Sequence, residues 1–257
     1  MNSIVYRGVP HESFYSNLAE VRQWHSGEVI LSTWEDVDVD ESMLDKVVRS
    51  KDPGENEDIG NPSLRFADRQ ILAARQGVLE ASGEKILLTR SDISHSKDLF
   101  GSIKVSEGIS PYRVFSAPLV VGSIMSIDPD SGFGPERDRY FRMCDWFQWG
   151  YKKDLDKFTD VIEELNKNKH SGCCLEQLWF LSCFNKFNKL QFEISEIESH
   201  KDECWKTIMQ NFKIINSVGF NTGKWNYKQE EPAYISENKY KKLSNFFINL
   251  DTQKETT

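Results

Sequence analysis

Residues 61–92 read NPSLRFADRQILAARQGVLEASGEKILLTRSD, and this stretch decides the fold. It predicts a long helix over Asn61–Ala81, with Asn61 as the N-cap and Pro62 at the first helical position. Glu84–Thr89 (EKILLT) follows and predicts a buried strand, which ends in Arg90-Ser91-Asp92. A long helix that leads directly into a buried strand is part of a βαβ unit.

The same alternation of strand and helix continues towards the N-terminus. The residues before this stretch predict a strand at Ser3–Gly8, a helix at Glu12–Trp24, a strand at Glu28–Trp34 and a short strand at Asp45–Ser50. Strands separated by helices of this length favour a mainly parallel sheet with helices packed on it. We therefore expect the α/β class.

The chain becomes less regular towards the C-terminus. Tyr112–Val121 predicts another strand, Asp128–Glu136 a Gly/Pro/Asp-rich loop, and Tyr140–Trp149 an aromatic-dense segment. Helix patterns dominate after that, at Asp154–Asn166, Cys174–Asn185 and Asp202–Phe212. The polar tail after Leu250 is expected to fray.

Composition excludes several classes of protein. The 257 residues include 39% hydrophobic side chains, which is typical of a globular chain and not of a disordered one. A net charge of −8 argues against a dedicated nucleic-acid binder, so no nucleic-acid partner is expected. The five cysteines form no C-x-x-C pair, which argues against structural zinc and indicates free thiols. Met1–Pro10 gives no signal peptide and no apolar run spans a bilayer, so we expect a cytoplasmic chain, at most peripherally attached to a membrane.

Arginine is unevenly distributed along the chain. All 11 arginines lie between Arg7 and Arg142, whereas residues 151–257 contain 16 lysines and no arginine. A biased genome would account for this pattern. The alternative is chemical, because the planar guanidinium suits phosphate and carboxylate in a way that lysine cannot copy. On that reading, an anionic ligand binds in the arginine-bearing part.

Polar and charged residues follow the predicted strands where each one ends. They are Gly8–Pro10, Trp34–Glu35, Asp52 and Arg90–Asp92. Ligands of open α/β sheets bind beyond the carboxyl ends of the strands, so these residues are expected to converge on one binding site.

Each candidate residue at this edge has a functional and a structural interpretation. Asp92 suits a divalent metal that bridges a diphosphate, or it caps an ordinary turn. Trp34 and Glu35 suit stacking on a base and a hydrogen bond to ribose, or they are a core tryptophan and a solvated acid. Arg69, four residues after Arg65 on one helix face, would reach a pyrophosphate or remain a surface charge.

Two further carboxylates, away from the strand ends, are candidate functional residues. Asp145 lies among aromatic residues, where it is either paired, functional or a helix N-cap. Glu176 lies near a predicted helix start, where a general base and a carboxylate stabilised by the helix dipole are both plausible interpretations.

A series of short motifs carries a family resemblance. Their order and spacing resemble the WavE lipopolysaccharide-synthesis family over roughly residues 4–185. The motifs are Ile30–Glu35 (ILSTWE), Asp68–Gln70 (DRQ) followed by Gly77, Leu88–Asp92 (LTRSD), Asp145–Phe147 (DWF) with Gly150, and Glu176-Gln177. Arg7 stands where the family pattern usually has Gln, and Leu88 where it usually has Lys.

The resemblance implies a Rossmann-like glycosyltransferase A-type fold at 1–185, with a mainly helical C-terminal extension at 186–257 packed on it. It implies that Gly8, Pro10, Trp34 and Glu35 bind the nucleotide, with Asp52 expected at the same edge. Arg69 and Arg90 would face the diphosphate, and Asp92 would hold Mn²⁺ or Mg²⁺. Asp145 would face the acceptor sugar, and Glu176 would be the base.

Three functions compete on this sequence. The first is a glycosyltransferase that moves a sugar from a nucleotide-sugar donor to a surface polysaccharide, either lipopolysaccharide or capsule. Its acceptor would be a glycan that is free or lipid-linked. The second is a non-catalytic subunit that binds a nucleotide sugar or glycan within a polysaccharide assembly complex. The third is a nucleotidyltransferase on a related fold, although no Gly-rich phosphate loop supports it.

Overall fold

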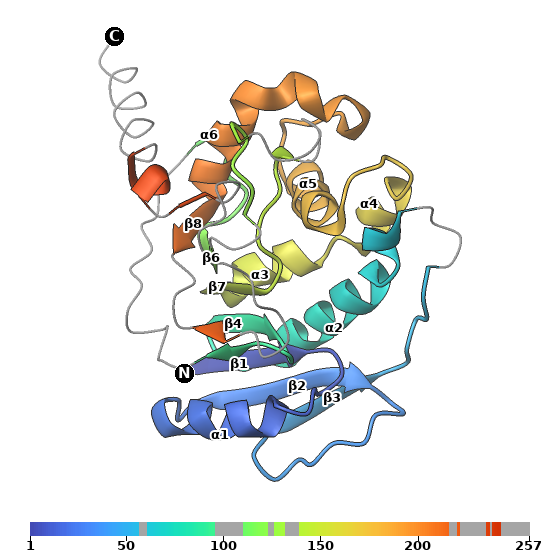
Figure 1. Cartoon of the computed structure of the whole chain (residues 1–257), viewed down its shortest axis with the longest axis vertical. Coiled ribbons are helices and arrows are strands. Elements are labelled where there is room, and N and C mark those ends of the chain that lie inside the picture. The colour runs from blue at the N-terminus through green and yellow to red at the C-terminus, as the bar shows by residue number, and fades with distance from the viewer. Residues whose placement is uncertain are drawn as a thin grey trace.

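The computed structural model describes residues 1–56, 61–95, 110–122, 126–131, 139–215, 220–221, 235–236 and 238–242. At its centre lies a seven-stranded sheet in the order β3-β2-β1-β4-β7-β6-β8 (Figure 1). Its strands are β1 (Asn2–Arg7), β2 (Glu28–Trp34), β3 (Lys46–Ser50), β4 (Lys85–Arg90), β6 (Leu119–Gly122), β7 (Phe147–Tyr151) and β8 (Phe212–Ile215). β7 runs antiparallel to both of its neighbours, and the other pairs are parallel.

Helices lie on both faces of this sheet (Figure 1). They are α1 (Phe14–Trp24), α2 (Ala67–Glu80), α3 (Lys152–Thr159), α4 (Ile162–Lys167), α5 (Leu175–Phe187) and α6 (Lys201–Asn211), with 3-10 turns at η1 (Pro62–Leu64) and η3 (Ile194–His200). A second, two-stranded sheet pairs β5 (Ser94–His95) with β9 (Phe220–Asn221). The expected α/β class, with a mainly parallel sheet flanked by helices, is confirmed.

Alternation along the strands divides the core into two layers. Ile4 and Tyr6 of β1 pack with Phe14 and Leu18 of α1 on one face. Val5, between them in sequence, belongs to the cluster on the other face, which includes Ile71 of α2. Successive side chains of a strand point to opposite faces, so the consecutive apolar residues within β1, β2 and β4 predict a sheet that is buried on both sides.

Gly77 sets how closely α2 approaches the sheet. A Cβ added at this position would overlap the side chain of Val5 and press on Ser32. The absence of a side chain therefore lets α2 lie against β1 and β2, and this close contact holds the N-terminal turn of α2 near the strand ends.

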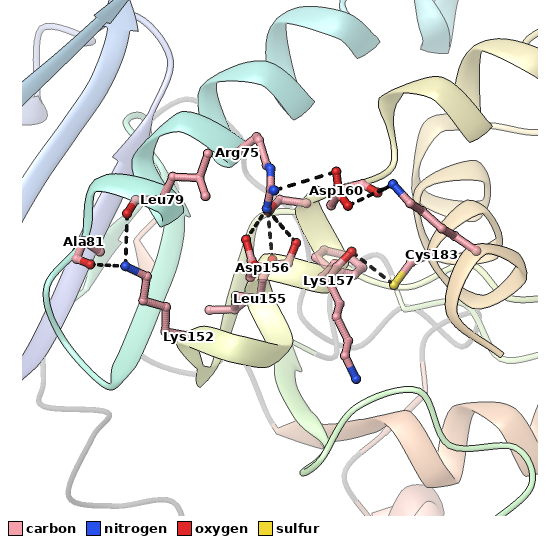
Figure 2. Close-up of polar contacts among 12 residues, drawn as sticks. Arg75, Leu79, Ala81, Lys152, Leu155, Asp156, Lys157, Asp160 and Cys183 are labelled. Atoms are coloured by element: carbon pink, nitrogen blue, oxygen red, sulfur yellow. Dashed lines mark hydrogen bonds and ion pairs between the residues drawn. The ribbon is translucent and has the colours of Figure 1, made fainter.

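The C-terminal half of α2 is fixed by contacts with α3 (Figure 2). Arg75 forms an ion pair with Asp156 and donates to its backbone carbonyl oxygen at 3.0 Å. The Nζ of Lys152 donates to the carbonyl oxygens of Leu79 and Ala81, at 3.0 and 2.5 Å. These last carbonyls of a helix have no partner within it, so Lys152 satisfies them and complements the negative end of the helix dipole.

Several predicted elements need correction at their ends. Helix Asn61–Ala81 is broken into η1 and α2, although Asn61 is the N-cap as predicted, accepting from the Ser63 N–H at 3.1 Å. Helix Asp154–Asn166 is broken at Asp160, where the backbone leaves helical geometry at φ −87° and ψ 58°.

The predicted strand Tyr112–Val121 is wrong for its first half, because only β6 forms. Side chains satisfy the backbone of the irregular part: Asn211 Oδ1 accepts from Val114 N–H and Asp154 Oδ1 accepts from Ser116 N–H, both at 2.7 Å. Pro118 has no N–H to offer a neighbouring strand, so regular pairing starts after it.

The described residues after 185 are mainly helical, but they also supply β8, which pairs with β6 in the central sheet. Residues 132–136 of the predicted loop Asp128–Glu136 and the tail after Leu250 lie outside the described residues. In the part of the chain that is described, no helix has both the length and the apolar character needed to cross a bilayer.

His95 is a buried histidine beside the sheet. It hydrogen-bonds Thr89 Oγ1 at 2.9 Å and lies against the rings of Tyr6 and Phe147. Burial lowers the pKa of its imidazole from 6.5 to about 3, so the folded protein holds it neutral.

We predict that this histidine makes the protein less stable in mild acid. The unfolded chain binds a proton at His95 below pH 6.5 and the folded chain does not, so its contribution is present above pH 6.5 and lost as pH falls. At pH 5 the loss is about 2 kcal/mol. Urea unfolding at pH 7 and pH 5 should show a shallower pH slope for His95→Gln, whereas the exposed His170→Gln should keep the wild-type slope. Equal slopes for His95→Gln and wild type would contradict the prediction.

Candidate functional site: a pocket at the carboxyl ends of the parallel strands

A pocket of about 580 Å³ lies beyond the carboxyl ends of β1, β2, β3 and β4, beside the N-terminal half of α2. This is the place where open parallel sheets bind their ligands. Its lining residues are Arg7, Gly8, Val9, Pro10, His11, Trp34, Asp36, Val37, Asp52, Phe66, Arg69, Gln70, Ala73, Arg90, Ser91 and Asp92.

The loop after β1 forms one wall, and Gly8 gives it its shape. Gly8 has φ +99°, which side chains rarely tolerate, and its N–H donates to the carbonyl oxygen of Ser32 at 2.9 Å. Ser91, after β4, donates its hydroxyl to the carbonyl oxygen of Val9 at 2.6 Å. The ends of β1 and β4 therefore fix each other, and the wall between them is rigid.

Arg7 lies below this loop and is 3% exposed. Its Nη1 donates to Gln70 Oε1 of α2 at 2.9 Å, and its Nη2 donates to the backbone carbonyl oxygen of Asp145 and lies 3.5 Å from the Asp145 carboxylate. The guanidinium also lies over the ring of Trp179 in α5, with 5.1 Å to the ring centroid. Its buried Nε–H has no hydrogen-bond partner among the described residues.

Burial lowers the pKa of Arg7 to about 10, and the negative charge of Asp145 counteracts part of that effect. The guanidinium therefore remains charged at neutral pH. A buried positive charge at the floor of a pocket attracts an anionic ligand more strongly than an exposed one, because water screens it less.

Arg69 is the second cation of the pocket. Its Nε and Nη2 donate to the two carboxylate oxygens of Asp52 at 2.7 and 2.5 Å, and its Nη1 lies 3.4 Å from Glu55. The two-point hydrogen bond with Arg69 lowers the pKa of Asp52 and raises that of Arg69. Asp52 therefore occupies the side of the guanidinium that a phosphate would use.

Arg90 and Asp92 form a similar pair at the end of β4. Nε and Nη2 of Arg90 donate to the two oxygens of Asp92 at 2.9 and 2.6 Å. Burial acts against the charge of Arg90, but the hydrogen bonds with Asp92 and the nearby Asp145 charge outweigh it, so its pKa is raised. The Nη1 group of Arg90 makes no hydrogen bond with any described residue, so it is available to a ligand.

Most of the residues predicted for the donor site line this single pocket. They are Gly8, Pro10, Trp34, Asp52, Arg69, Arg90 and Asp92. Glu35 is not among the lining residues. The turn after β2, closed by the Val37 N–H on the Trp34 carbonyl oxygen at 3.3 Å, brings Asp36 into the pocket instead.

The two predicted catalytic carboxylates lie outside the lining. Asp145 is 6% exposed beneath the pocket and is the ion-pair partner of Arg7. Glu176, in the first turn of α5, lies 3.6 Å from Arg142, and its side chain is 13% exposed. Their catalytic roles stay predictions.

Sequence reasoning gave no site role to several further members of the pocket. Arg7, Asp36, Phe66 and Gln70 all line it. Arg7 carried a readable signal, because a charged residue that ends the apolar run Ser3–Tyr6 must be paired or functional. Phe66 carried none, because one aromatic within a predicted helix is expected in the core.

The fit of a divalent cation depends on Asp92. Among the described residues no three His, Cys, Asp or Glu side chains come together as a ready metal site. Mg²⁺ is commonly held by one or two carboxylates together with substrate phosphates and water. In such an arrangement Asp92 would be the single protein ligand, and phosphate oxygens of a bound ligand would supply the others.

The fold and the pocket together define an α/β protein with an arginine-lined pocket at the edge of a parallel sheet, where aspartates balance the arginine charges. The model of the family described as WavE lipopolysaccharide synthesis matches residues 6–234. The chain therefore belongs to the WavE lipopolysaccharide-synthesis family. The match continues beyond residue 185, where the sequence resemblance was expected to end.

Two solved structures resemble the chain at low identity. They are the crystal structure of the glycosyltransferase GlyE in Streptococcus pneumoniae TIGR4 (12% identity, TM-score 0.38) and its apo form (11% identity, TM-score 0.40). Both alignments cover 75% of this chain, and they cover 46% and 44% of the GlyE chains. The chain thus spans less than half the length of these structures. No match was found among curated proteins.

We predict that Asp145→Asn destabilises the fold. The change leaves the backbone acceptor of Arg7 in place but removes the charge that compensates a fully buried guanidinium, a loss of about 3–5 kcal/mol. Urea unfolding at pH 7 measures it. Glu80→Gln is the matched control, because the Lys46–Glu80 pair is about half exposed and should contribute about 1 kcal/mol or less. Equal losses in the two variants would show that the Arg7–Asp145 pair is no more important than a surface pair.

Proposed function

We propose that this protein is a glycosyltransferase that takes a sugar from a nucleotide-sugar donor and attaches it to the glycan of a lipopolysaccharide or a capsule. The pocket at the strand ends is the observation that carries the proposal, because it gathers three guanidinium groups in a member of a lipopolysaccharide-synthesis family. The acceptor would be a free or lipid-linked glycan.

The proposed reaction releases a nucleoside diphosphate, so negative charge develops on the leaving group. Arg90 offers its open Nη1 to that charge, Arg69 offers the hydrogens that Asp52 does not take, and Arg7 adds a fixed positive field from below. Fixed donors and charges of this kind stabilise a developing anion because they need no reorganisation during the reaction. A divalent cation, held by Asp92, would supply further charge neutralisation when bound.

An inverting transfer also needs a base for the acceptor hydroxyl. Glu176 remains our candidate for that role: it also faces an arginine, but Arg142 does not line the pocket, whereas Asp145 compensates the charge of Arg7, which does. Asp145 would then act by holding Arg7 in place under the donor, rather than by contacting the acceptor sugar.

A non-catalytic role has one observation in its favour. Both oxygens of Asp92 already accept hydrogen bonds from Arg90, so the pair is neutralised without any ligand. A subunit that only binds a nucleotide sugar or glycan would tolerate that arrangement. Binding alone cannot distinguish it from an enzyme, whereas release of nucleoside diphosphate from a nucleotide sugar can.

Calorimetric titration with UDP, GDP, CDP and ADP, each with and without Mn²⁺, tests the donor site. We expect one nucleoside diphosphate to bind clearly more tightly than the others. Incubation with the matching nucleotide sugars and a lipopolysaccharide or capsule extract should then release that nucleoside diphosphate. No binding by any nucleotide would contradict the proposal, and binding without turnover would favour the non-catalytic role.

We predict that Arg69→Lys and Arg90→Lys each weaken nucleoside diphosphate binding by about tenfold or more. An ammonium group cannot pair with a carboxylate through two parallel bonds and still present a hydrogen to phosphate. Calorimetry of the tightest nucleotide measures the loss. Arg22→Lys is the control, because Arg22 pairs with Asp45 at the surface and neither residue lines the pocket. Affinities within twofold of wild type would assign both pocket arginines a structural role.

We predict that Asp92→Asn removes the effect of Mn²⁺ on nucleotide affinity. Without metal, the variant should bind as tightly as wild type or more tightly, because Asp92 no longer competes with phosphate for Arg90. Titrations with and without Mn²⁺ give both values. The same Mn²⁺ enhancement in variant and wild type would exclude Asp92 as a metal ligand.

A further inference from the structure

A second pocket lies at the opposite end of β4, where α2 ends and α3 begins (Figure 2). It has a volume of about 550 Å³. β4 runs from Lys85 to Arg90, so its six residues place the second pocket about 17 Å from the first. A ligand bound here therefore lies away from the proposed site of sugar transfer. The lining residues are Leu79, Glu84, Tyr151, Lys152, Lys153 and Asp156.

Two of the charged groups in this lining already have partners. The Lys152 ammonium donates to two carbonyl oxygens at the end of α2, and Asp156 forms an ion pair with Arg75. Lys153 and Glu84 differ from them, because both side chains are exposed and neither forms an ion pair with any described residue. The second pocket thus offers a cation and a carboxylate that do not neutralise each other.

The Tyr151 ring holds Lys153 in place without neutralising it. The ammonium group of Lys153 lies 5.5 Å from the ring centroid, and that of Lys85 lies at the same distance from the same ring. An aromatic ring attracts an ammonium group through its quadrupole, but it carries no net charge. The two lysines therefore keep their full positive charge, whereas Arg69 and Arg90 in the first pocket each face a carboxylate.

These groups suit a sugar that bears an acidic group. The two ammonium groups attract a carboxylate or a phosphate, and the Glu84 carboxylate accepts hydrogen bonds from hydroxyl groups. Leu79 is 44% exposed and offers an apolar surface to the C–H groups of a sugar ring. A volume of about 550 Å³ is within the range of pockets that hold small ligands.

An anionic membrane is the rival partner for exposed lysines beside an exposed leucine. Membrane-bound surfaces present protruding apolar residues together with basic ones. This surface is hollow instead, and anionic lipid headgroups would repel the unpaired carboxylate of Glu84. The observations therefore favour a sugar over a membrane.

We infer that the second pocket binds an acidic sugar unit of the glycan, with its carboxylate or phosphate on Lys153 and Lys85 and its hydroxyl groups on Glu84. The inference rests on the proposed function for its class of ligand, because the acceptor polysaccharide is taken as the source of the sugar. It adds a site that holds the polysaccharide at a distance from the transfer reaction, and it makes that polysaccharide an acidic one.

Calorimetry with trigalacturonate and maltotriose tests the inference. Both are trisaccharides, and only the first carries carboxylates. Ammonium groups are point charges that impose little geometry, so a simple acidic trisaccharide is a sufficient probe. The wild-type protein should bind trigalacturonate more tightly than maltotriose. Lys153→Glu should weaken trigalacturonate by about fivefold or more and leave maltotriose and nucleoside diphosphate within about twofold of wild type.

Lys206→Glu is the matched control. The Lys206 ammonium also lies over a tyrosine ring, 5.6 Å from the centroid of Tyr112, and neither residue lines the second pocket. The control changes the net charge of the protein by the same amount and should keep the affinity for trigalacturonate. Thermal unfolding checks the fold of each variant, and Lys153→Gln, which removes the charge without reversing it, should also weaken trigalacturonate.

The outcomes separate this inference from the proposed function. Equal wild-type affinities for the two trisaccharides, or equal losses in Lys153→Glu and Lys206→Glu, would overturn the inference and leave the nucleotide site standing. Sedimentation with phosphatidylglycerol vesicles tests the rival partner. Vesicle binding that Lys153→Glu removes, without a preference for trigalacturonate, would assign the lysines to a membrane. Binding of trigalacturonate that depends on Lys153, in a protein that binds no nucleoside diphosphate, would support the sugar site and contradict the donor site.

Discussion

The buried charge of Arg7 constrains the whole region around the pocket. A guanidinium that is removed from water is costly, and each group that compensates it belongs to a different element of the fold. Gln70 comes from α2, Asp145 from the segment before β7, and Trp179 from α5. Moving any one of these elements would leave the charge without part of its compensation. Arg7 therefore ties the two helices and the antiparallel strand to the end of β1.

The other two arginines of the pocket are held in a complementary way. Arg69 and Arg90 each face a carboxylate through two hydrogen bonds, so their planar groups are oriented before any ligand arrives. Such pairs make the apo pocket nearly neutral, and they make phosphate compete with Asp52 and Asp92. A simple anion would gain little binding free energy by replacing a carboxylate on these arginines. A ligand gains more binding free energy if it makes contacts elsewhere in the pocket or brings a cation that pairs with the displaced carboxylate. The pocket therefore favours a large ligand over free phosphate.

The sequence predicted the parallel half of the fold well because β1, β2 and β4 each contain an apolar run that is followed by polar residues. β2 was predicted at Glu28–Trp34 and is found there. β7 was missed because the segment was interpreted only as aromatic-dense, although Phe147, Trp149 and Tyr151 alternate with Gln148 and Gly150 as in a strand. Glu35 and Asp36 show why the sequence alone does not identify every residue of the pocket. Both follow β2, and only the geometry of the turn decides which one lines the pocket. Ion pairs such as Arg7–Asp145 join residues far apart in sequence, and no local pattern reveals them.

Arginine and lysine occupy different parts of the chain, and the pocket arginines and the later lysines also make different contacts. The three arginines of the pocket all come from the parallel strands and from α2, which together form its floor and walls. Beyond Arg142, lysines such as Lys152 and Lys186 end on backbone carbonyls at helix ends, where a point charge is sufficient. A planar fork is needed only where a carboxylate or phosphate must be held in a fixed orientation. The arginine-bearing part thus lines the pocket that we propose as the ligand site, whereas lysines of the later part bind carbonyl oxygens at the C-terminal ends of α2 and α3.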